Sequence, residues 1–330
     1  MLKAVLAAVG FFTALSAVAA PSEKLVEQPV KTIKGLRVSG FKGNLTFVSA
    51  EGANLTVEAR AKSDDQLWRP IVENVDGWIQ ISVQGPPSKS DWRNVAIPAL
   101  DLDVKGPSVP LNVVWKEGDI TLKGWKASAV MTQHKGKFFA EGGAAPLKIS
   151  TLEGEASVTG HQGRVTVDNY NARVTLKNVD GGLDLENFSG LLSVDASKGD
   201  ISLKASKGRT QITGHKGRFE FDVSQGEIGI ANSEGPVRGQ GEQGSVAIDL
   251  KGTADVKIRA ESTKVAIGVP RSSGAKVDLG TQDGNFSVSF PLKYDRIEKT
   301  KIMKGNLAGK DSGLIFVRTR SGDIRLKPVK

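Results

Sequence analysis

The chain has 330 residues, of which 39% are hydrophobic and 25% are charged, and its formal net charge is +9. This balance is typical of a folded protein and excludes a disordered chain. The sequence contains 38 glycines, 13 prolines, three histidines and no cysteine. The absence of cysteine excludes disulfide scaffolds, thiolate metal sites and cysteine nucleophiles, and three histidines leave little room for a histidine-based metal or catalytic centre.

The first twenty residues have the pattern of a secretory signal peptide. Lys3 precedes an apolar run from Ala4 to Leu15, and Ala17-Val18-Ala19 forms an A-x-A cleavage site. The alternative, a membrane anchor, needs a longer apolar run. We therefore expect residues 1–20 to be removed by cleavage near Ala19. The mature chain is then expected to be extracytoplasmic (periplasmic, at the outer surface or secreted) and to have no transmembrane segment.

Residues 21–117 are expected to form a β-rich cap together with the first coils of a repeated β-structure. Alternating apolar residues predict strands at 33–38, 45–48, 55–59 and 78–83, followed by an irregular stretch as far as Pro110. Tryptophans in this region would cover the exposed terminal strand of the repeated structure, and the alternative is an aromatic platform that binds carbohydrate. All five tryptophans of the chain precede residue 126: Trp68, Trp78, Trp92, Trp115 and Trp125.

A nine-residue period organises the middle of the chain. In steps of nine from residue 154 to residue 244, ten of eleven positions are glycine. The second and fourth residues after each turn position are mostly apolar, and the residue between them is polar. After Gly163, for example, Val165 and Val167 are apolar. Such alternation predicts a short strand with one buried face, and glycine permits the tight turn that follows. The turn glycines are Gly154, Gly163, Gly181, Gly190, Gly199, Gly208, Gly217, Gly226, Gly235 and Gly244.

Two nine-residue units together fit one coil of a parallel β-solenoid. The side-chain volumes favour this pairing, because Phe219 and Phe221 would then stack beside Val237 and Gly239 and keep the width of the coil constant. An antiparallel meander, which pairs strands nine residues apart, is the alternative. A calcium-binding solenoid is disfavoured, since lysine at the turns repels calcium. We predict an all-β fold, a parallel β-solenoid of about eighteen residues per coil over residues 118–330, with no metal and no cofactor.

The repeated pattern is expected to reach the C-terminus with one interruption. The period shifts by one residue near Thr253, and the hexapeptide GDITLK at Gly118 recurs in similar form at Gly199 and at Gly322. Residues 291–312 form a basic excursion that is a candidate for contact with an anionic surface, and a solvated loop is the alternative. Its candidate binding residues are Lys293, Arg296, Lys299, Lys301 and Lys304.

Carboxylates and histidines provide the remaining candidates for chemistry. One predicted outer face carries Asp168, Asp184, Glu186, Asp200, Glu220 and Asp222. Two carboxylates at a suitable spacing are the acid and base of a polysaccharide-cleaving enzyme. Cationic residues are interleaved with them, however, and mixed charge is what solvation and cross-strand pairing produce. The three histidines, His134, His161 and His215, lie before or near corners, where we expect exposed side chains too far apart to share a metal.

The Gly-x-Ile-x-Leu repeats, the signal peptide and the closing Arg320-Ser321-Gly322-Asp323-Ile324-Arg325 resemble the bacterial putative-adhesin β-solenoid family of exported proteins similar to autotransporter adhesin heads. The resemblance extends from about Ile33 to Leu326 and carries over no binding residues, because the motif consists of turn glycines and core aliphatics. It implies a non-enzymatic binding or structural module of the cell envelope or surface. We expect its partner to be an anionic glycan, the envelope surface or another envelope protein, and not nucleic acid. The alternative function is a polysaccharide lyase or hydrolase built on a parallel β-helix.

Overall fold

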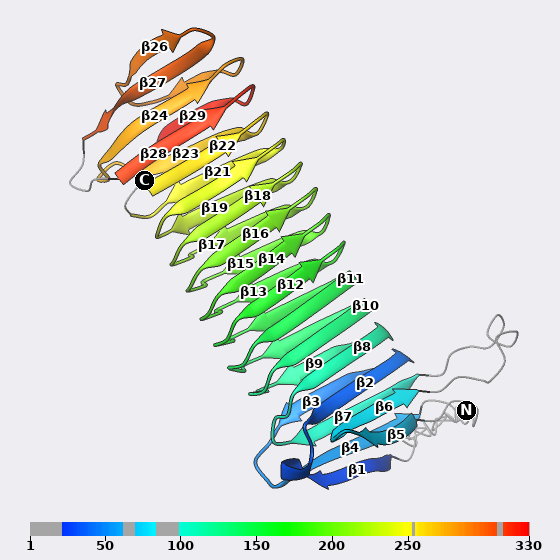
Figure 1. Cartoon of the computed structure of the whole chain (residues 1–330). Coiled ribbons are helices and arrows are strands. Elements are labelled where there is room, and N and C mark those ends of the chain that lie inside the picture. The colour runs from blue at the N-terminus through cyan, green and yellow to red at the C-terminus, as the bar shows by residue number, and fades with distance from the viewer. Residues whose placement is uncertain (1–21, 62–69, 84–98, 253–254, 309–312, 330) are drawn as a thin grey trace, which may run out of the picture.

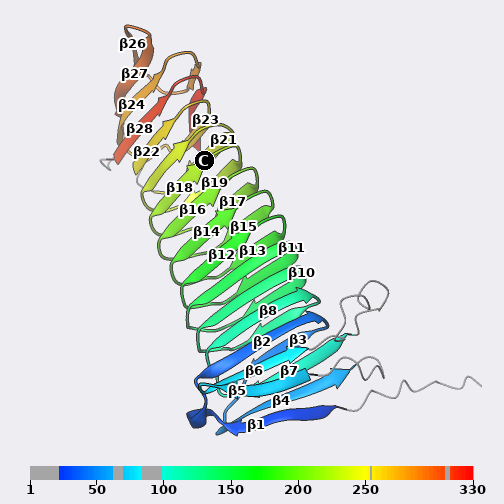
Figure 2. The same cartoon turned by 45° about the vertical axis from the view of Figure 1, so that its right-hand side comes forward.

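The computed structural model describes residues 22–61, 70–83, 99–252, 255–308 and 313–329. Strands account for 68% of the structure and belong to one hydrogen-bonded, mostly parallel sheet. They are stacked along one long axis, with β1 at one end and β26 and β27 at the other (Figure 1, Figure 2). The expected signal peptide lies outside the described residues. Within those residues, no helix is long and apolar enough to cross a membrane.

The N-terminal end combines antiparallel and parallel pairs. Strand β4 pairs antiparallel with β1 and β7, and β5 pairs antiparallel with β6. Strands β2 and β3 pair in parallel with β8 and β9, which continue into the long stack. The elements are β1 (Glu23–Pro29), the 3-10 turn η1 (Val30–Thr32), β2 (Gly35–Lys42), β3 (Leu45–Ser49), β4 (Asn54–Ala61), β5 (Pro70–Val75), β6 (Trp78–Val83), β7 (Leu100–Gly106), β8 (Leu111–Glu117) and β9 (Ile120–Lys123).

The expectation of an irregular stretch as far as Pro110 is wrong for β7. Leu100, Leu102 and Val104 alternate with polar residues and are buried, so this segment forms a strand with one face in the core. Two tryptophans, Trp115 and Trp125, are core residues. The indole N–H groups of Trp115 and Trp125, both buried, donate to the carbonyl oxygens of Gly43 (2.8 Å) and Val109 (2.9 Å).

Trp78 is half-buried, with the guanidinium of Arg37 4.5 Å from its ring centroid. Trp68 and Trp92 lie outside the described residues. The core role is therefore confirmed for Trp115 and Trp125, and neither of them belongs to an exposed carbohydrate platform.

The middle of the chain is a regular series of parallel strands. Val165 of β12 pairs with Leu183 of β14, and Leu183 pairs with Ile201 of β16, so hydrogen-bonded neighbours alternate along the series. This pairing excludes an antiparallel meander over these strands. The series comprises β10 (Ala129–Glu141), β11 (Leu147–Thr159), β12 (Val165–Asn169), β13 (Arg173–Lys177), β14 (Leu183–Asn187), β15 (Leu191–Asp195), β16 (Ile201–Ala205), β17 (Arg209–Thr213), β18 (Phe219–Val223), β19 (Glu227–Ser233), β20 (Val237–Gly241), β21 (Ser245–Leu250), β22 (Asp255–Ala260) and β23 (Lys264–Pro270).

The spacing of paired residues increases by one between β20 and β22. Phe219 of β18 pairs with Val237 of β20, whereas Val237 pairs with Val256 of β22, one residue further on than the preceding spacing gives. The sequence predicts a one-residue shift of the repeat period near Thr253, and these residue pairs confirm the shift. Thr253 itself lies outside the described residues.

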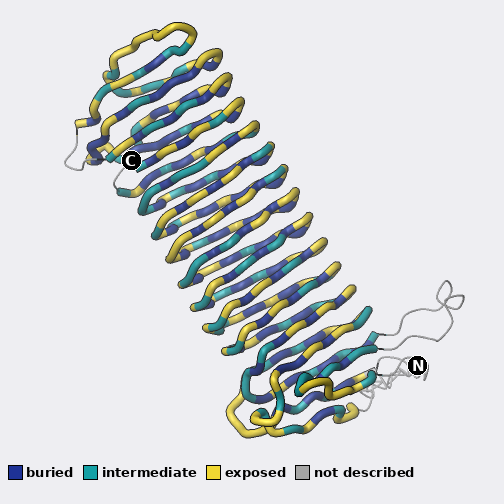
Figure 3. The backbone as a smooth tube through the Cα atoms, viewed as in Figure 1, coloured by how far each residue is buried: buried dark blue, intermediate teal, exposed yellow. Residues whose placement is uncertain are grey.

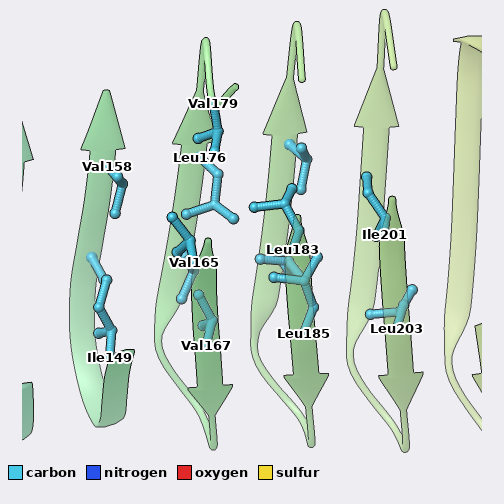
Figure 4. Close-up of a cluster of buried hydrophobic side chains, with 14 of the residues drawn as sticks. Ile149, Val158, Val165, Val167, Leu176, Val179, Leu183, Leu185, Ile201 and Leu203 are labelled. Carbon is cyan, nitrogen blue, oxygen red and sulfur yellow. The ribbon is translucent and has the colours of Figure 1, made fainter. Parts of the chain in front are cut away.

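Buried side chains of the facing strands form a narrow apolar core. Buried and exposed residues alternate along strands such as β16 and β18 (Figure 3). Figure 4 shows Val165, Leu176 and Leu183 pointing into the space between the strands. Phe221 of β18 pairs with Gly239 of β20. A Cβ atom on Gly239 would lie 2.1 Å from Phe221 Cζ, so the ring occupies the space of the missing side chain. This confirms the predicted juxtaposition of a large and a small residue.

Glycine and asparagine close the corners of the stack. A Cβ atom on Gly217 would lie 2.2 Å from the carbonyl oxygen of Gly199, and the φ angle of Gly217 is 143°. At another corner, the buried Asn169 side chain donates from Nδ2 to the carbonyl oxygen of Ala172 (2.9 Å) and to Oδ1 of Asn187 (3.0 Å). Asn169 therefore stabilises its own turn and is hydrogen-bonded to the equivalent asparagine of the next turn in the stack.

The C-terminal strands fold back into the stack before the chain ends. Strand β28 pairs in parallel with β22 and β24, and β29 pairs with β23 and β25. Beyond them, β27 pairs antiparallel with β24 and β26, which makes β26 the last strand at this end. These strands are β24 (Ala275–Thr281), β25 (Phe286–Val288), β26 (Lys293–Ile297), β27 (Thr300–Leu307), β28 (Gly313–Thr319) and β29 (Ile324–Val329). Residues 309–312 of the expected excursion lie outside the described residues.

Candidate functional site

The basic excursion predicted from the sequence contains the β26–β27 hairpin, which divides the five candidate binding residues. Lys293 lies opposite Lys304, and Arg296 lies opposite Lys301. Directly opposite residues share a face, and residues three apart on a strand point to opposite faces, so the two pairs lie on different sides of the hairpin. Lys299 lies in the turn between the strands. Lys301 donates from Nζ to the carbonyl oxygen of Gly284 (2.9 Å), which ties it to a corner of the stack.

The Lys293–Lys304 pair continues across the sheet into a larger basic surface. Lys304 lies opposite Asp278 of β24, and the same row passes through Phe316 of β28 to Lys257 of β22 and Arg238 of β20. Arg318 of β28 lies beside Arg259 of β22 in the next row. We call this surface the C-terminal basic surface, and its cations are Arg238, Lys257, Arg259, Lys276, Lys293, Lys304 and Arg318.

Two of the seven cations are neutralised by carboxylates. Arg238 forms an ion pair with Asp255 (2.7 Å), and Arg318 forms one with Asp278 (2.8 Å) while its guanidinium lies 4.5 Å from the Phe316 ring centroid. Within the residues that the structure describes, the other five cations of the surface form no ion pair: Lys257, Arg259, Lys276, Lys293 and Lys304. The surface therefore keeps an excess of positive charge, although Asp295 of β26 is exposed beside it.

Five members of this surface were missed by the sequence analysis: Arg238, Lys257, Arg259, Lys276 and Arg318. They belong to four strands: β20 pairs directly with β22, and β28 joins β22 to β24. One feature of the sequence could have revealed part of this surface: the one-residue shift of the nine-residue period, which places Lys257 beside Arg238. A shallow hollow of about 310 Å³ lies at the inner end of the surface, with Arg238, Lys257 and Arg259 among its lining residues.

Four of the six carboxylates on the outer face of the earlier strands form ion pairs with cations. Arg164 donates from Nη2 to Asp184 Oδ1 (2.8 Å), and this hydrogen bond raises the pKa of Arg164. Lys148 pairs with Asp168 (3.0 Å), and the backbone N–H of Arg218 donates to Asp200 Oδ1 (3.3 Å). The remaining carboxylates of the face either pair with a cation, as Glu186 pairs with Lys204 (3.3 Å) and Glu220 with Arg218 (3.8 Å), or are exposed, as is Asp222. Cross-strand pairing, which the sequence analysis weighed against a catalytic pair, accounts for most of this face.

The expectation that all three histidines are exposed at corners is wrong for His161 and His215, which are buried. His134 is exposed, as expected, but lies within strand β10. Each buried ring lies two residues before a corner glycine, points into the stack and contacts polar atoms there. The ring of His161 lies 2.8 Å (Nε2) and 3.2 Å (Nδ1) from the carbonyl oxygens of Ala145 and Gly142. His215 Nδ1 lies 3.0 Å from Ser197 Oγ. In the described part of the chain, no group of three or more His, Asp or Glu side chains is arranged to hold a metal ion.

Burial of His215 makes folding sensitive to pH. Desolvation lowers the pKa of His215 below its ordinary value of 6.5, while hydrogen bonds to the backbone partly oppose this shift. The unfolded chain therefore takes up a proton near pH 6.5 that the folded chain resists, and stability is lost as pH falls from above 6.5 toward the lower folded pKa. Urea unfolding between pH 7.5 and pH 5 is expected to show this loss.

The same measurement on His215→Gln is expected to show a weaker dependence on pH, because the amide does not titrate. His134→Gln is the matched control, since His134 is exposed, and it should keep the pH dependence of the unsubstituted protein. Equal slopes for His215→Gln and the unsubstituted protein would show that His215 does not cause the effect.

Comparison with known proteins finds no matching family model and no matching curated protein. Two solved structures align along most of this chain. A putative cell adhesion protein from Clostridium sporogenes shares 12% identity with a TM-score of 0.23, and the alignment covers 94% of this chain and 100% of that chain. A putative adhesin from Parabacteroides distasonis shares 12% identity with a TM-score of 0.31, covering 93% of this chain and 97% of that chain.

Proposed function

We propose that this chain is an exported, non-enzymatic, adhesin-like binding module of the bacterial cell envelope or surface, and that it contacts an anionic glycan through the C-terminal basic surface. The observation that carries the proposal is the set of five cations without an ion-pair partner, gathered on one face by strands β22, β24, β26 and β27. Repeated carboxylates or sulfates along a polymer match such a set, because each weak contact adds to the total.

The fold supplies the rigid support for this contact. We infer that the strand series is a parallel β-solenoid with eighteen residues per coil, lengthened to nineteen where β20 meets β22; the in-register pairs that join alternate strands support this inference. Residues 118–330 would form the solenoid and residues 21–117 its cap, after cleavage of a signal peptide near Ala19. A long stack with its basic surface near one end presents that surface away from the cap (Figure 1).

A binding measurement with and without three of the unpaired cations tests the proposal. The triple variant Lys257→Gln, Arg259→Gln, Lys276→Gln is expected to bind immobilised dextran sulfate about 3- to 150-fold more weakly than the unsubstituted protein, since each exposed ionic contact contributes roughly 0.2–1 kcal/mol. Binding of the unsubstituted protein should weaken as salt is raised, and neutral dextran should not bind.

The matched control removes the same charge elsewhere. The triple variant Lys123→Gln, Lys126→Gln, Lys177→Gln changes three exposed lysines on other coils and should bind dextran sulfate within about twofold of the unsubstituted protein. Equal losses in the two triple variants would mean that net charge alone drives binding, and the basic surface would not be a site. Release of reducing ends from either polysaccharide would contradict a non-enzymatic role.

A further inference from the structure

Two exposed aromatic side chains form the start of a ladder along one corner of the stack. Tyr170 and Phe188 follow β12 and β14 at equivalent positions, and 52% and 43% of their surfaces are exposed. Their rings are parallel within 9°, with centroids 4.8 Å apart. This distance equals the usual spacing of neighbouring strands, so the rings stack along the axis of the protein. One face of Phe188 is thus covered by Tyr170, and its other face points toward the next coil.

The next two positions of the ladder are small. Ser206 and Ser224 follow β16 and β18 at the positions equivalent to Phe188, and Glu242 follows β20. The step from phenylalanine to serine leaves a shallow hollow of about 360 Å³ beyond the open face of the ring. Its lining includes Phe188, Ser206, Ser224, Glu186, Asp222 and Glu242.

The hollow is locally acidic on a chain of net charge +9. Three carboxylates line it against one ammonium group, that of Lys204. Lys204 pairs with Glu186 (3.3 Å), and the Ser224 hydroxyl donates to Glu242 (2.9 Å). Within the described residues, Asp222 forms no ion pair. Lys207 follows Ser206 in the chain but does not line the hollow.

We propose that this hollow binds the guanidinium group of an arginine side chain presented by another protein. A guanidinium is flat, so it can stack on the open face of Phe188 as the next rung of the ladder. It is also cationic, and its N–H groups are arranged to donate to carboxylates such as Asp222 and Glu242. A lysine ammonium lacks the flat surface, and a neutral sugar leaves the negative charge unmatched. This site lies outside the C-terminal basic surface and has the opposite charge, so it goes beyond the proposed function.

The test is a titration of the isotope-labelled full-length protein with N-acetyl-arginine N-methylamide, followed by NMR. The amide signals of Ser206 and Ser224 are expected to shift, and the citrulline analogue, which is isosteric and neutral, should shift neither. Phe188→Ser and Asp222→Asn should each weaken binding about 2- to 5-fold, because exposed cation–π and ionic contacts each contribute roughly 0.5–1 kcal/mol. Both side chains are exposed at the surface, so the variants are expected to fold.

The matched controls are Leu191→Ser and Asp195→Asn, which change an apolar and an acidic residue of β15 that do not line the hollow. Both should bind the arginine compound like the unsubstituted protein. Equal shifts with the citrulline analogue, or unchanged affinity in Phe188→Ser and Asp222→Asn, would overturn the proposal. So would shifts of Ser206 and Ser224 caused by methyl glucoside and not by the arginine compound, which would assign the hollow to a carbohydrate.

Discussion

Replacing Gly217 with valine is expected to lower the free energy of unfolding by about 2–6 kcal/mol. The φ angle of Gly217 is 143°, which strains any residue with a Cβ atom by roughly 1–3 kcal/mol. The added Cβ would also lie 2.2 Å from the carbonyl oxygen of Gly199, and relieving an overlap with backbone costs about 1–3 kcal/mol more. Urea unfolding followed by circular dichroism measures the change.

Gly52→Val is the control that separates these two effects. Gly52 has a φ angle of 145°, close to that of Gly217, but no atom lies within 4 Å of the position of its Cβ. Its substitution should therefore show the backbone strain alone and destabilise less than Gly217→Val. If the two variants lose equal stability, the close stacking of corner glycines contributes nothing to the fold.

Replacing Phe221 with alanine is expected to destabilise the protein by about 3–5 kcal/mol, as is usual for a buried phenylalanine. Gly239→Leu alone should also destabilise, because its side chain would overlap the Phe221 ring. The double variant should be more stable than Phe221→Ala alone, since the leucine then fills the cavity that the ring has left. A double-mutant cycle measured by urea unfolding gives this coupling.

Phe139→Ala is the control for the loss of a phenylalanine. Phe139 is 43% exposed, so its removal should change stability by no more than about 0.5 kcal/mol. Strictly additive effects of Phe221→Ala and Gly239→Leu would show that the two positions do not share space, and would contradict the argument that large residues neighbour small ones in this core.

The middle of the fold could be predicted because its pattern is local and repeated. Each unit carries its own strand alternation and turn glycine, so Val165, Leu183 and Ile201 show their equivalence in the sequence itself. Strand β7 was missed because its five-residue alternation stands alone among prolines and has no repeat to support it. The insertion of β28 between β22 and β24 was also missed, since it depends on pairing between segments about sixty and about forty residues apart.

The candidate site was predicted only in part for the same reason. Lys293 and Lys304 belong to one hairpin, and their clustering in sequence reveals them. Lys257 and Arg259 lie on the same face only because of how the strands pair, and these two residues do not belong to a basic cluster in the sequence. The burial of His161 and His215 was missed because a histidine beside a corner glycine has the same local sequence whether its ring turns inward or outward. The carbonyl oxygen of Ala145 and the hydroxyl group of Ser197, which precede these histidines in the chain, decide the direction.

Strands β14, β16 and β18 pair with one constant spacing, and this spacing determines how such a chain can change in length. Because Leu183, Ile201 and Phe219 occupy equivalent places, removal or duplication of the segment between two of them would leave every remaining corner matched to its neighbour. Each such event would move the C-terminal basic surface relative to β1 by one strand spacing, about 4.8 Å. The length of the stack is therefore set by the number of its strands, so related chains can differ in length while both ends keep their structure.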